Sequence, residues 1–148
     1  MKTYKGYTPE VTLKKIKSDF PKVRLTNSEE TVQFIRKFYH DDISIYESMF
    51  LLMLNRASTT IAFAKISQGG VVSTSVDIKI IAKYAIESLS SGVIICHNHP
   101  SGNLTPSNTD KEITERIKKT LSIFDCHLHD HIILTEEGYF SFADEEIL

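Results

Sequence analysis

The sequence has few cysteines, and nothing in their placement indicates a disulfide or a cysteine metal site. Cys96 and Cys126 are the only two, and neither belongs to a Cys-x-x-Cys pair. Cys96 ends the apolar segment 92–96, so we expect a reduced and buried thiol there. Thiols that stay reduced are typical of intracellular proteins, and we therefore expect a cytoplasmic location.

An excess of charge, a long apolar run and a signal peptide are also missing. The net charge is −2, and the basic residues are dispersed among acidic ones. Domains that bind DNA or RNA are usually strongly basic, so we do not expect direct contact with nucleic acid. No segment approaches the ~20 apolar residues of a membrane-spanning helix. Residues 1–7 lack the apolar core of a signal peptide, so the sequence predicts no membrane association.

The 148 residues suffice for one domain with an ordinary core, and no internal repeat divides them. Residues 1–26 show no firm period, and we expect an N-terminal extension with a short strand or turn. Residues 27–148 form the predicted domain. Its apolar patterns predict helices over 27–39, 78–89 and 107–121, a hairpin of strands 49–54 and 60–66, and strands at 93–96, 132–134 and 139–142. This order favours an α/β fold with a mixed β-sheet flanked by helices.

The most informative motif directly follows the predicted strand 93–96. It reads His97-Asn98-His99-Pro100. Residues two apart on a strand point the same way, with Cα atoms about 6–7 Å apart, so both imidazoles can bind one metal ion. A loop with proline and glycine then leads to Ser107 and to Asp110, which lies on the inward stripe of the next predicted helix. Two imidazoles and a carboxylate would leave the fourth position of a zinc site open for water, as in catalytic zinc sites.

Each part of this motif also has an ordinary structural explanation. Histidine pairs of this kind occur by chance on surface strands, and Ser107 with Asp110 forms the usual capping-box pattern at a helix start. The combination favours a metal site, because a solvated histidine pair does not need an aspartate that points inward. A capping role for Ser107 is compatible with either interpretation.

These residues resemble the metal-binding signature of the JAMM (MPN+, Mov34/JAB) metalloproteases, in which His-x-His-Pro is followed by serine and aspartate at this spacing. The downstream segment 130–133, Asp-His-Ile-Ile, resembles the RadC branch of that family, and the resemblance covers residues 27–148. It implies a cytidine-deaminase-like α/β sandwich and a Zn²⁺ ion bound by His97, His99 and Asp110. It further implies that Glu47 accepts the proton of the attacking water and that Ser107 hydrogen-bonds the oxyanion.

A second histidine cluster lies near the C-terminus. His127, His129 and His131 alternate, and on one strand face they could form a three-histidine zinc site. No apolar shell or fourth ligand is evident around them, so we do not expect such a site. Asp130 and His131 are instead expected to be structural or to contact the metal ligands without binding the metal themselves. Asn98 points away from the two motif histidines and is expected to be structural.

The leading hypothesis is a zinc-dependent peptidase or isopeptidase that hydrolyses an amide bond in a peptide or protein-conjugate substrate through a metal-activated water. One alternative is a non-catalytic, metal-containing module of a DNA-repair-associated, RadC-type protein. Many RadC-type proteins carry an N-terminal helix-hairpin-helix region, which residues 1–46 are too few and too different to supply. Hydrolysis of a small-molecule amide, or a deaminase-like reaction, would use the same site chemistry. An exposed edge strand could make the protein a homodimer.

Overall fold

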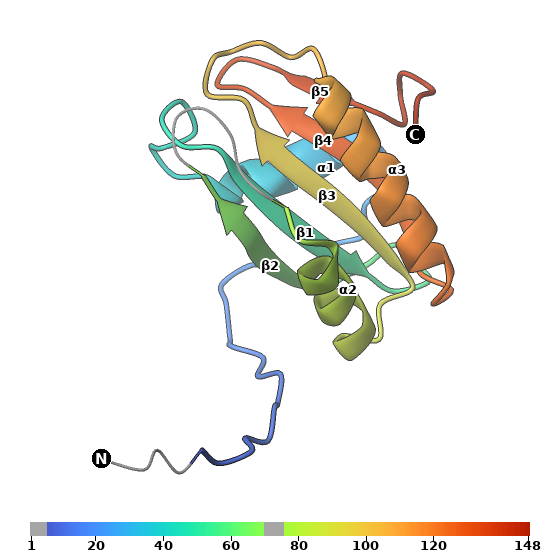
Figure 1. Ribbon diagram of the computed structural model, residues 1–148. Coiled ribbons are helices and arrows are strands. Elements are labelled where there is room, and N and C mark those ends of the chain that lie inside the picture. The colour runs from blue at the N-terminus through green and yellow to red at the C-terminus, as the bar shows by residue number, and fades with distance from the viewer. Residues whose placement is uncertain (1–5, 70–75) are drawn as a thin grey trace, which may run out of the picture.

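The structure is a computed structural model that describes residues 6–69 and 76–148. These residues form a five-stranded sheet with helices on both faces (Figure 1). In chain order the elements are α1 (Ser28–Ile35), the short 3-10 helix η1 (Arg36–Phe38), β1 (Ser48–Leu54), β2 (Thr60–Gln68), α2 (Ile78–Glu87), β3 (Gly92–Asn98), α3 (Asn108–Ser122), β4 (His127–Leu134) and β5 (Tyr139–Ser141). The predicted α/β class, with a mixed sheet flanked by helices, is confirmed.

The sheet has the strand order β2-β1-β3-β4-β5. β1 pairs antiparallel with β2, which confirms the predicted hairpin, and antiparallel with β3 on its other side. β3 and β4 are parallel and are joined by α3, which crosses one face of the sheet. β5 pairs antiparallel with β4. The crossover brings the first turns of α3 over the C-terminal ends of β3 and β4, where the motif histidines lie.

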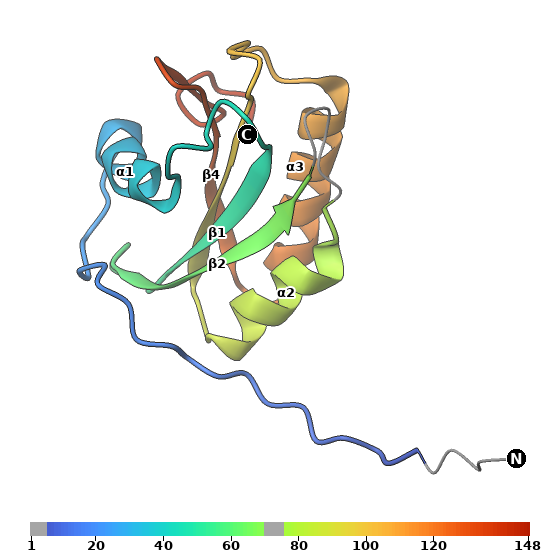
Figure 2. The ribbon, with the colours of Figure 1, turned by 90° about the vertical axis from the view of Figure 1, so that its left-hand side faces the viewer.

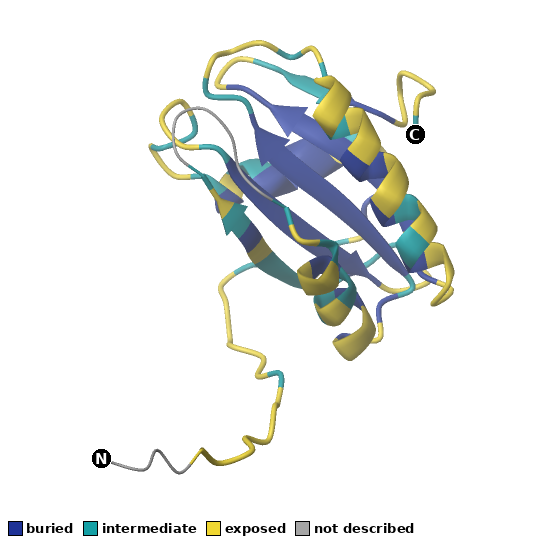
Figure 3. Cartoon of the chain, in the orientation of Figure 1, coloured by how far each residue is buried: buried dark blue, intermediate teal, exposed yellow. Residues whose placement is uncertain are grey.

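Two apolar clusters, one on each face of the sheet, form the core. α2 and α3 cover one face with residues such as Ile81, Ala85 and Ile117. α1 covers the opposite face with Val32 and Ile35. Figure 2 shows the sheet between these two layers, and Figure 3 shows that β1 and β3 are buried along their whole length. Such strands are buried on both sides, which explains their continuous apolar sequences.

The helices depart from the predictions mainly at their ends. α2 ends at Glu87. Ile86, near its end, and Leu89, just beyond it, follow the apolar spacing of the helix, yet they are 41% and 87% exposed. Leu89 adopts a left-handed φ of 51° in the turn toward β3, so the predicted inward stripe does not extend to it. The first predicted helix is α-helical only to Ile35 and continues as η1. None of the helices in the described parts of the chain is long and apolar enough to cross a membrane.

The start of the chain contributes little regular structure. Residues 6–23 contain neither helix nor strand, and the first of them run away from the sheet (Figures 1 and 2). Where a short strand or turn was expected in this extension, the structure has an isolated bridge between Arg24 and Thr59. Phe20 and Leu25 nevertheless pack on the α1 side of the core.

Candidate metal centre

The end of β3 brings His97 and His99 to the start of α3. His97 belongs to β3 and is 1% exposed, and His99 follows the strand directly. Their Nε2 atoms lie 2.9 Å apart. Asp110 enters from the first turn of α3, with Oδ1 3.2 Å from His97 Nε2 and Oδ2 3.4 Å from His99 Nε2. The three residues singled out as ligands therefore lie together.

Glu47 reaches the same point from the residue before β1. Its Oε1 lies 3.9 Å from His97 Nε2. Ligand atoms of Glu47, His97 and His99 lie within 4.8 Å of one another and form a potential metal-binding group. Two imidazoles and two carboxylates thus surround one point, and either Asp110 or Glu47 could supply the third ligand.

The spacing of these atoms fits a small divalent metal ion. Two ligand atoms at about 2.0–2.1 Å from a zinc ion lie about 3.3 Å apart at the tetrahedral angle. The distances among His97, His99 and Asp110 range from 2.9 to 3.4 Å. Lone pairs of two imidazoles and a carboxylate at this range repel one another unless a proton or a metal ion lies between them. The donor set therefore favours a bound cation.

The chain after β3 orients His99. Its Nδ1 lies 2.6 Å from the carbonyl oxygen of Asn103, and because a carbonyl can only accept, Nδ1 donates. The lone pair of Nε2 is then directed toward the other donors. Gly102, at a φ of 83°, forms the turn that returns Asn103 to the histidine. The hydrogen bond with Asp110 raises the pKa of His99 above its usual value, against the effect of burial, so a proton can occupy the metal-free site.

The start of α3 fixes Asp110. Ser107 is the N-cap: its hydroxyl accepts from the Asp110 N–H at 3.0 Å, and its own N–H donates to Asp110 Oδ2 at 2.8 Å. The predicted capping box is confirmed. Burial would raise the pKa of Asp110, but its contacts with the imidazoles of His97 and His99 outweigh it and hold the pKa far below its usual value. The helix N-terminus also favours a negative charge here.

Asn98 fastens the segment that carries Glu47 to β3. Asn98 lies between the two motif histidines in the sequence, and its side chain is fully buried. Asn98 Oδ1 accepts from the Ser48 N–H at 2.8 Å, and the amide donates to the carbonyls of Ile43 and Tyr46 at 2.6 and 2.7 Å. The expected structural role is confirmed, and the bonds show what it holds: the approach of Glu47 to the site.

A β-bulge separates the histidines of β4. The pairing register of β4 with β3 shifts by one residue at His129. His131 consequently lies beside His97, with ring centroids 4.8 Å apart, whereas His129 lies against Gly92 and close to His127. The predicted alternation of the three histidines on one strand face is therefore wrong, because the bulge turns His131 toward His97.

Asp130 ties the end of the chain to β4. Its Oδ1 accepts from the backbone N–H groups of His131 and Ala143 at 2.7 and 3.0 Å, and its Oδ2 accepts from the Ser141 hydroxyl at 2.6 Å. Burial raises the pKa of Asp130, although these hydrogen bonds oppose the shift. Asp130 is thus a structural residue that supports the strand of His131.

His131 connects His97 to α3. Its Nε2 lies 2.7 Å from His97 Nδ1, and its Nδ1 lies 2.5 Å from the Thr114 hydroxyl. The same hydroxyl donates to the carbonyl oxygen of Asp110 at 2.6 Å. Burial lowers the pKa of His131 well below its usual value, and the neighbouring imidazole of His97 lowers it further. Sequence reasoning missed Thr114; its spacing of four from Asp110, which places both on one helix face, was the available signal.

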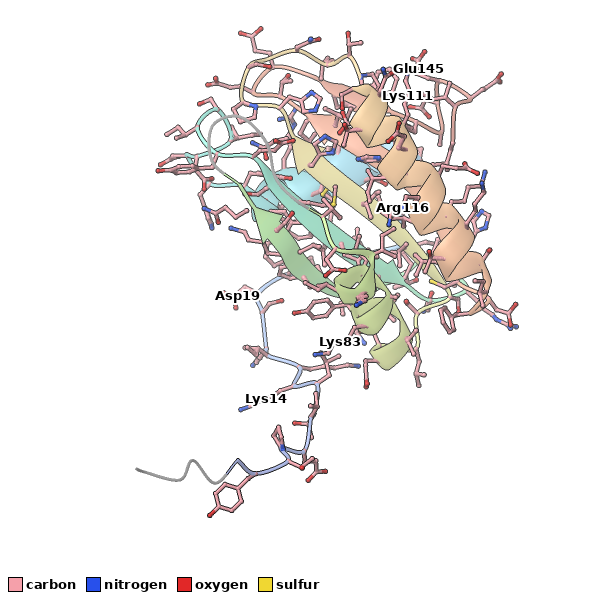
Figure 4. All side chains as sticks on the ribbon, viewed as in Figure 1. Lys14, Asp19, Lys83, Lys111, Arg116 and Glu145 are labelled. Carbon is pink, nitrogen blue, oxygen red and sulfur yellow. The ribbon has the colours of Figure 1, made fainter. Side chains whose placement is uncertain are left out.

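A cleft of about 250 Å³ opens beside the ligands and includes Glu47, His97 and Asp110 in its wall. Met49, Val76 and Ile113 supply apolar surface, and Arg116 extends into its wall from α3 (Figure 4). Among the described residues, no carboxylate lies within ion-pair distance of Arg116. The cleft therefore has a mixed lining, in which the guanidinium of Arg116 and the carboxylate of Glu112 lie beside a few apolar side chains next to the candidate metal centre.

Comparison with known proteins gives one family match and several relatives. The model of a family described as "RadC-like JAB domain" matches residues 25–147. A UPF0758 protein of Flavobacterium johnsoniae is 44% identical over 102 residues, which are 69% of this chain and 44% of the relative. A UPF0758 protein of Porphyromonas gingivalis is 42% identical over 103 residues, 69% of this chain and 45% of the relative. A UPF0758 protein of Shewanella baltica is 35% identical over 120 residues, which are 81% of this chain and 52% of the relative. The chain spans about half the length of these relatives.

Proposed function

Because the chain belongs to the RadC-like JAB domain family, as its motif predicted, we propose that it is a zinc-dependent hydrolase that cleaves an amide bond in a peptide or a protein conjugate. The observation that carries the proposal is the convergence of two imidazole nitrogens and two carboxylates on one point. Three protein ligands with one open position are the usual composition of catalytic zinc sites. Within the α/β class, we propose the cytidine-deaminase-like sandwich that the motif implies.

We assign Asp110 as the third ligand and Glu47 as the base. The Asp110 oxygens lie 3.2 and 3.4 Å from the two Nε2 atoms, close to the about 3.3 Å expected between ligands of tetrahedral zinc. Glu47 Oε1 is farther out, 3.9 Å from His97 Nε2. The capping box also fixes Asp110 in place, which suits a ligand. The outer carboxylate is better placed to exchange a proton with water and substrate.

A zinc ion held by these residues would lower the pKa of water to about 7 and polarise the scissile carbonyl. Glu47 would accept the proton of the attacking water on a carboxylate oxygen and return it to the leaving amine. Ser107 would donate its hydroxyl proton to the developing oxyanion. It can do so while capping α3, because it accepts in the bond from Asp110 N–H and keeps its own proton free.

The cleft beside the ligands supports a peptide-like substrate. Val76, with the exposed edges of Met49 and Ile113, offers a small apolar surface for a side chain next to the scissile bond. The guanidinium of Arg116 offers a partner for a carboxylate of the substrate. A substrate that places an apolar residue near the cleaved bond and a carboxylate at Arg116, away from Glu112, would use these contacts.

Metal analysis of matched variants tests the metal site. The purified protein is expected to hold stoichiometric zinc, to lose it in His97→Ala and to keep it in His127→Ala, which removes a histidine outside the candidate metal centre. A protein without zinc, or zinc that is unaffected by His97→Ala, would contradict the site.

Turnover on a peptide library tests the hydrolase. Glu47→Gln is expected to keep the zinc and to lose about 10²–10⁴-fold in rate, because only the proton acceptor is removed. If the zinc-loaded parent protein cleaves no library member or protein conjugate, the hydrolase is refuted in favour of a non-catalytic metal-containing module.

A further inference from the structure

We propose that Thr114 and His131 form a hydrogen-bond relay that fixes the tautomer of His97, so that the lone pair of His97 Nε2 faces the metal centre. The inference rests on the proposed metal site and adds two positioning residues to it. Thr114 acts through His131, and His131 acts through His97. The relay explains why a buried histidine and a helix threonine lie behind a ligand histidine.

The direction of the relay is set at the Thr114 hydroxyl. Its oxygen lies 2.6 Å from the carbonyl oxygen of Asp110, and two oxygens at this distance need a proton between them. Only the hydroxyl has one, so it donates to the carbonyl. Toward His131 Nδ1, 2.5 Å away, the same oxygen must accept, and His131 Nδ1 therefore carries a proton.

His131 passes this direction on to His97. The ring of His131 is fully buried and stacks on Phe142 with centroids 4.6 Å apart, surroundings that disfavour a second proton and its charge. A neutral imidazole has one N–H, so His131 Nε2 is an acceptor. His97 Nδ1, 2.7 Å away, must donate to it, which leaves His97 Nε2 without a proton in the neutral ring.

The two ligand histidines are thus fixed by different devices. His99 donates directly to a backbone carbonyl, that of Asn103, whose acceptor character cannot change. His97 donates to another imidazole, which could accept or donate, and only the Thr114 hydroxyl decides between these states. Partners of this kind behind a ligand histidine contribute about 10–100-fold to metal affinity. Thr114 is therefore expected to control zinc binding through two intervening hydrogen bonds.

Thr114→Val is the decisive variant, because it keeps the shape of threonine and removes only the hydroxyl. Without its acceptor at Nδ1, His131 can move its proton to Nε2, donate to His97 Nδ1 and force the His97 proton onto Nε2. Zinc affinity is expected to fall about 10–100-fold. Thr114→Ser, which keeps the hydroxyl, should restore the affinity of the parent protein. Thr120→Val makes the same change elsewhere on α3 and should have no effect on zinc binding.

Nitrogen-15 NMR of the histidine rings reads the tautomers without any turnover, at about pH 8.5, above the usual pKa of imidazole. In the parent protein the proton of His131 is expected on Nδ1, with and without zinc, and in Thr114→Val on Nε2. A parent protein with the proton on His131 Nε2 overturns the relay even if no variant folds. The relay is also overturned if the ring protons of Thr114→Val are unchanged and this variant binds zinc as tightly as Thr120→Val does. A protein that shows these tautomers but hydrolyses nothing refutes the proposed hydrolase and leaves the relay standing.

Discussion

Replacement of Asn98 by alanine should uncouple Glu47 from the metal centre and destabilise the fold. The substitution removes three hydrogen bonds and leaves the Ser48 N–H and the carbonyls of Ile43 and Tyr46 without their partner. A buried polar group that loses its partner costs about 1–3 kcal/mol. The Ser48 backbone is buried, whereas Ile43 and Tyr46 are partly exposed, so water can recover part of the loss there. We expect a total loss of about 2–4 kcal/mol, a large share of the about 5–15 kcal/mol that stabilises a typical domain.

Urea denaturation of the parent protein and Asn98→Ala measures this loss, and a melting temperature lower by about 6–12 °C should accompany it. Asn98→Asp should do no better than alanine, because a carboxylate keeps the acceptor for the Ser48 N–H but turns a second acceptor toward two carbonyls. Asn108→Ala, at an exposed position of α3, is the matched control.

Zinc binding and turnover should respond differently to the same change. The proposed ligands His97, His99 and Asp110 make no hydrogen bond to the Asn98 side chain. Zinc affinity in folded Asn98→Ala should therefore stay close to that of the parent protein, while turnover falls toward that of Glu47→Gln. Stability within about 1 kcal/mol of the parent protein would refute the reasoning, since it would mean that the three bonds contribute no more than one typical hydrogen bond.

Three further predictions concern the cap, the pH and the α2–β3 turn. Ser107→Ala should cost about 1 kcal/mol of unfolding free energy through the lost N-cap, and an additional loss of about 10²–10³ in rate would indicate the oxyanion contact. In the metal-free protein, the raised pKa of His99 means that its protonated form should add stability at acidic pH, and this stability is lost as pH rises through that pKa. The lowered pKa of Asp110 means that its carboxylate should add stability at higher pH, and this stability is lost as pH falls toward strong acid. Zinc at the proposed site would compete with the His99 proton, so zinc affinity should rise with pH over the range in which His99 titrates. A zinc affinity that does not change with pH there would contradict the site. Leu89→Asn should stabilise the protein by about 0.5–1 kcal/mol, because asparagine tolerates the left-handed φ of 51° better than leucine; an unchanged denaturation midpoint would show that the turn is unstrained.

The sequence predicted those features that depend on neighbouring residues. The hairpin of β1 and β2 follows from two apolar runs around a turn, and the start of α3 follows from the capping box of Ser107 and Asp110. His97 and His99 could be paired because strand geometry repeats every second residue. Asp110 could be added because a short loop and one helix turn limit where it can lie.

Features that depend on pairing between distant segments could not be predicted in this way. The bulge at His129 inserts one residue opposite β3 and reverses the face of everything after it, and no local pattern in β4 reveals that insertion. Asn98 binds backbone groups of residues 43–48, which are far away in sequence. Ile86 likewise fits the helical period of α2 but is exposed, because the period does not show where the helix packs against the rest of the protein. In each case the position of the side chain depends on a contact with a segment that is distant in sequence.

The positions of the proposed ligands along the chain bear on how zinc would act on the denatured protein. His97, His99 and Asp110 all lie between residues 97 and 110, within one strand end, one loop and one helix start. Closing so short a loop costs an unfolded chain little entropy, so the denatured ensemble should retain measurable zinc affinity. Binding to the unfolded state reduces the stabilisation that a ligand confers on the native state. The rise in melting temperature with zinc should therefore understate native affinity, and zinc could order this segment before residues 43–48 deliver Glu47 to it.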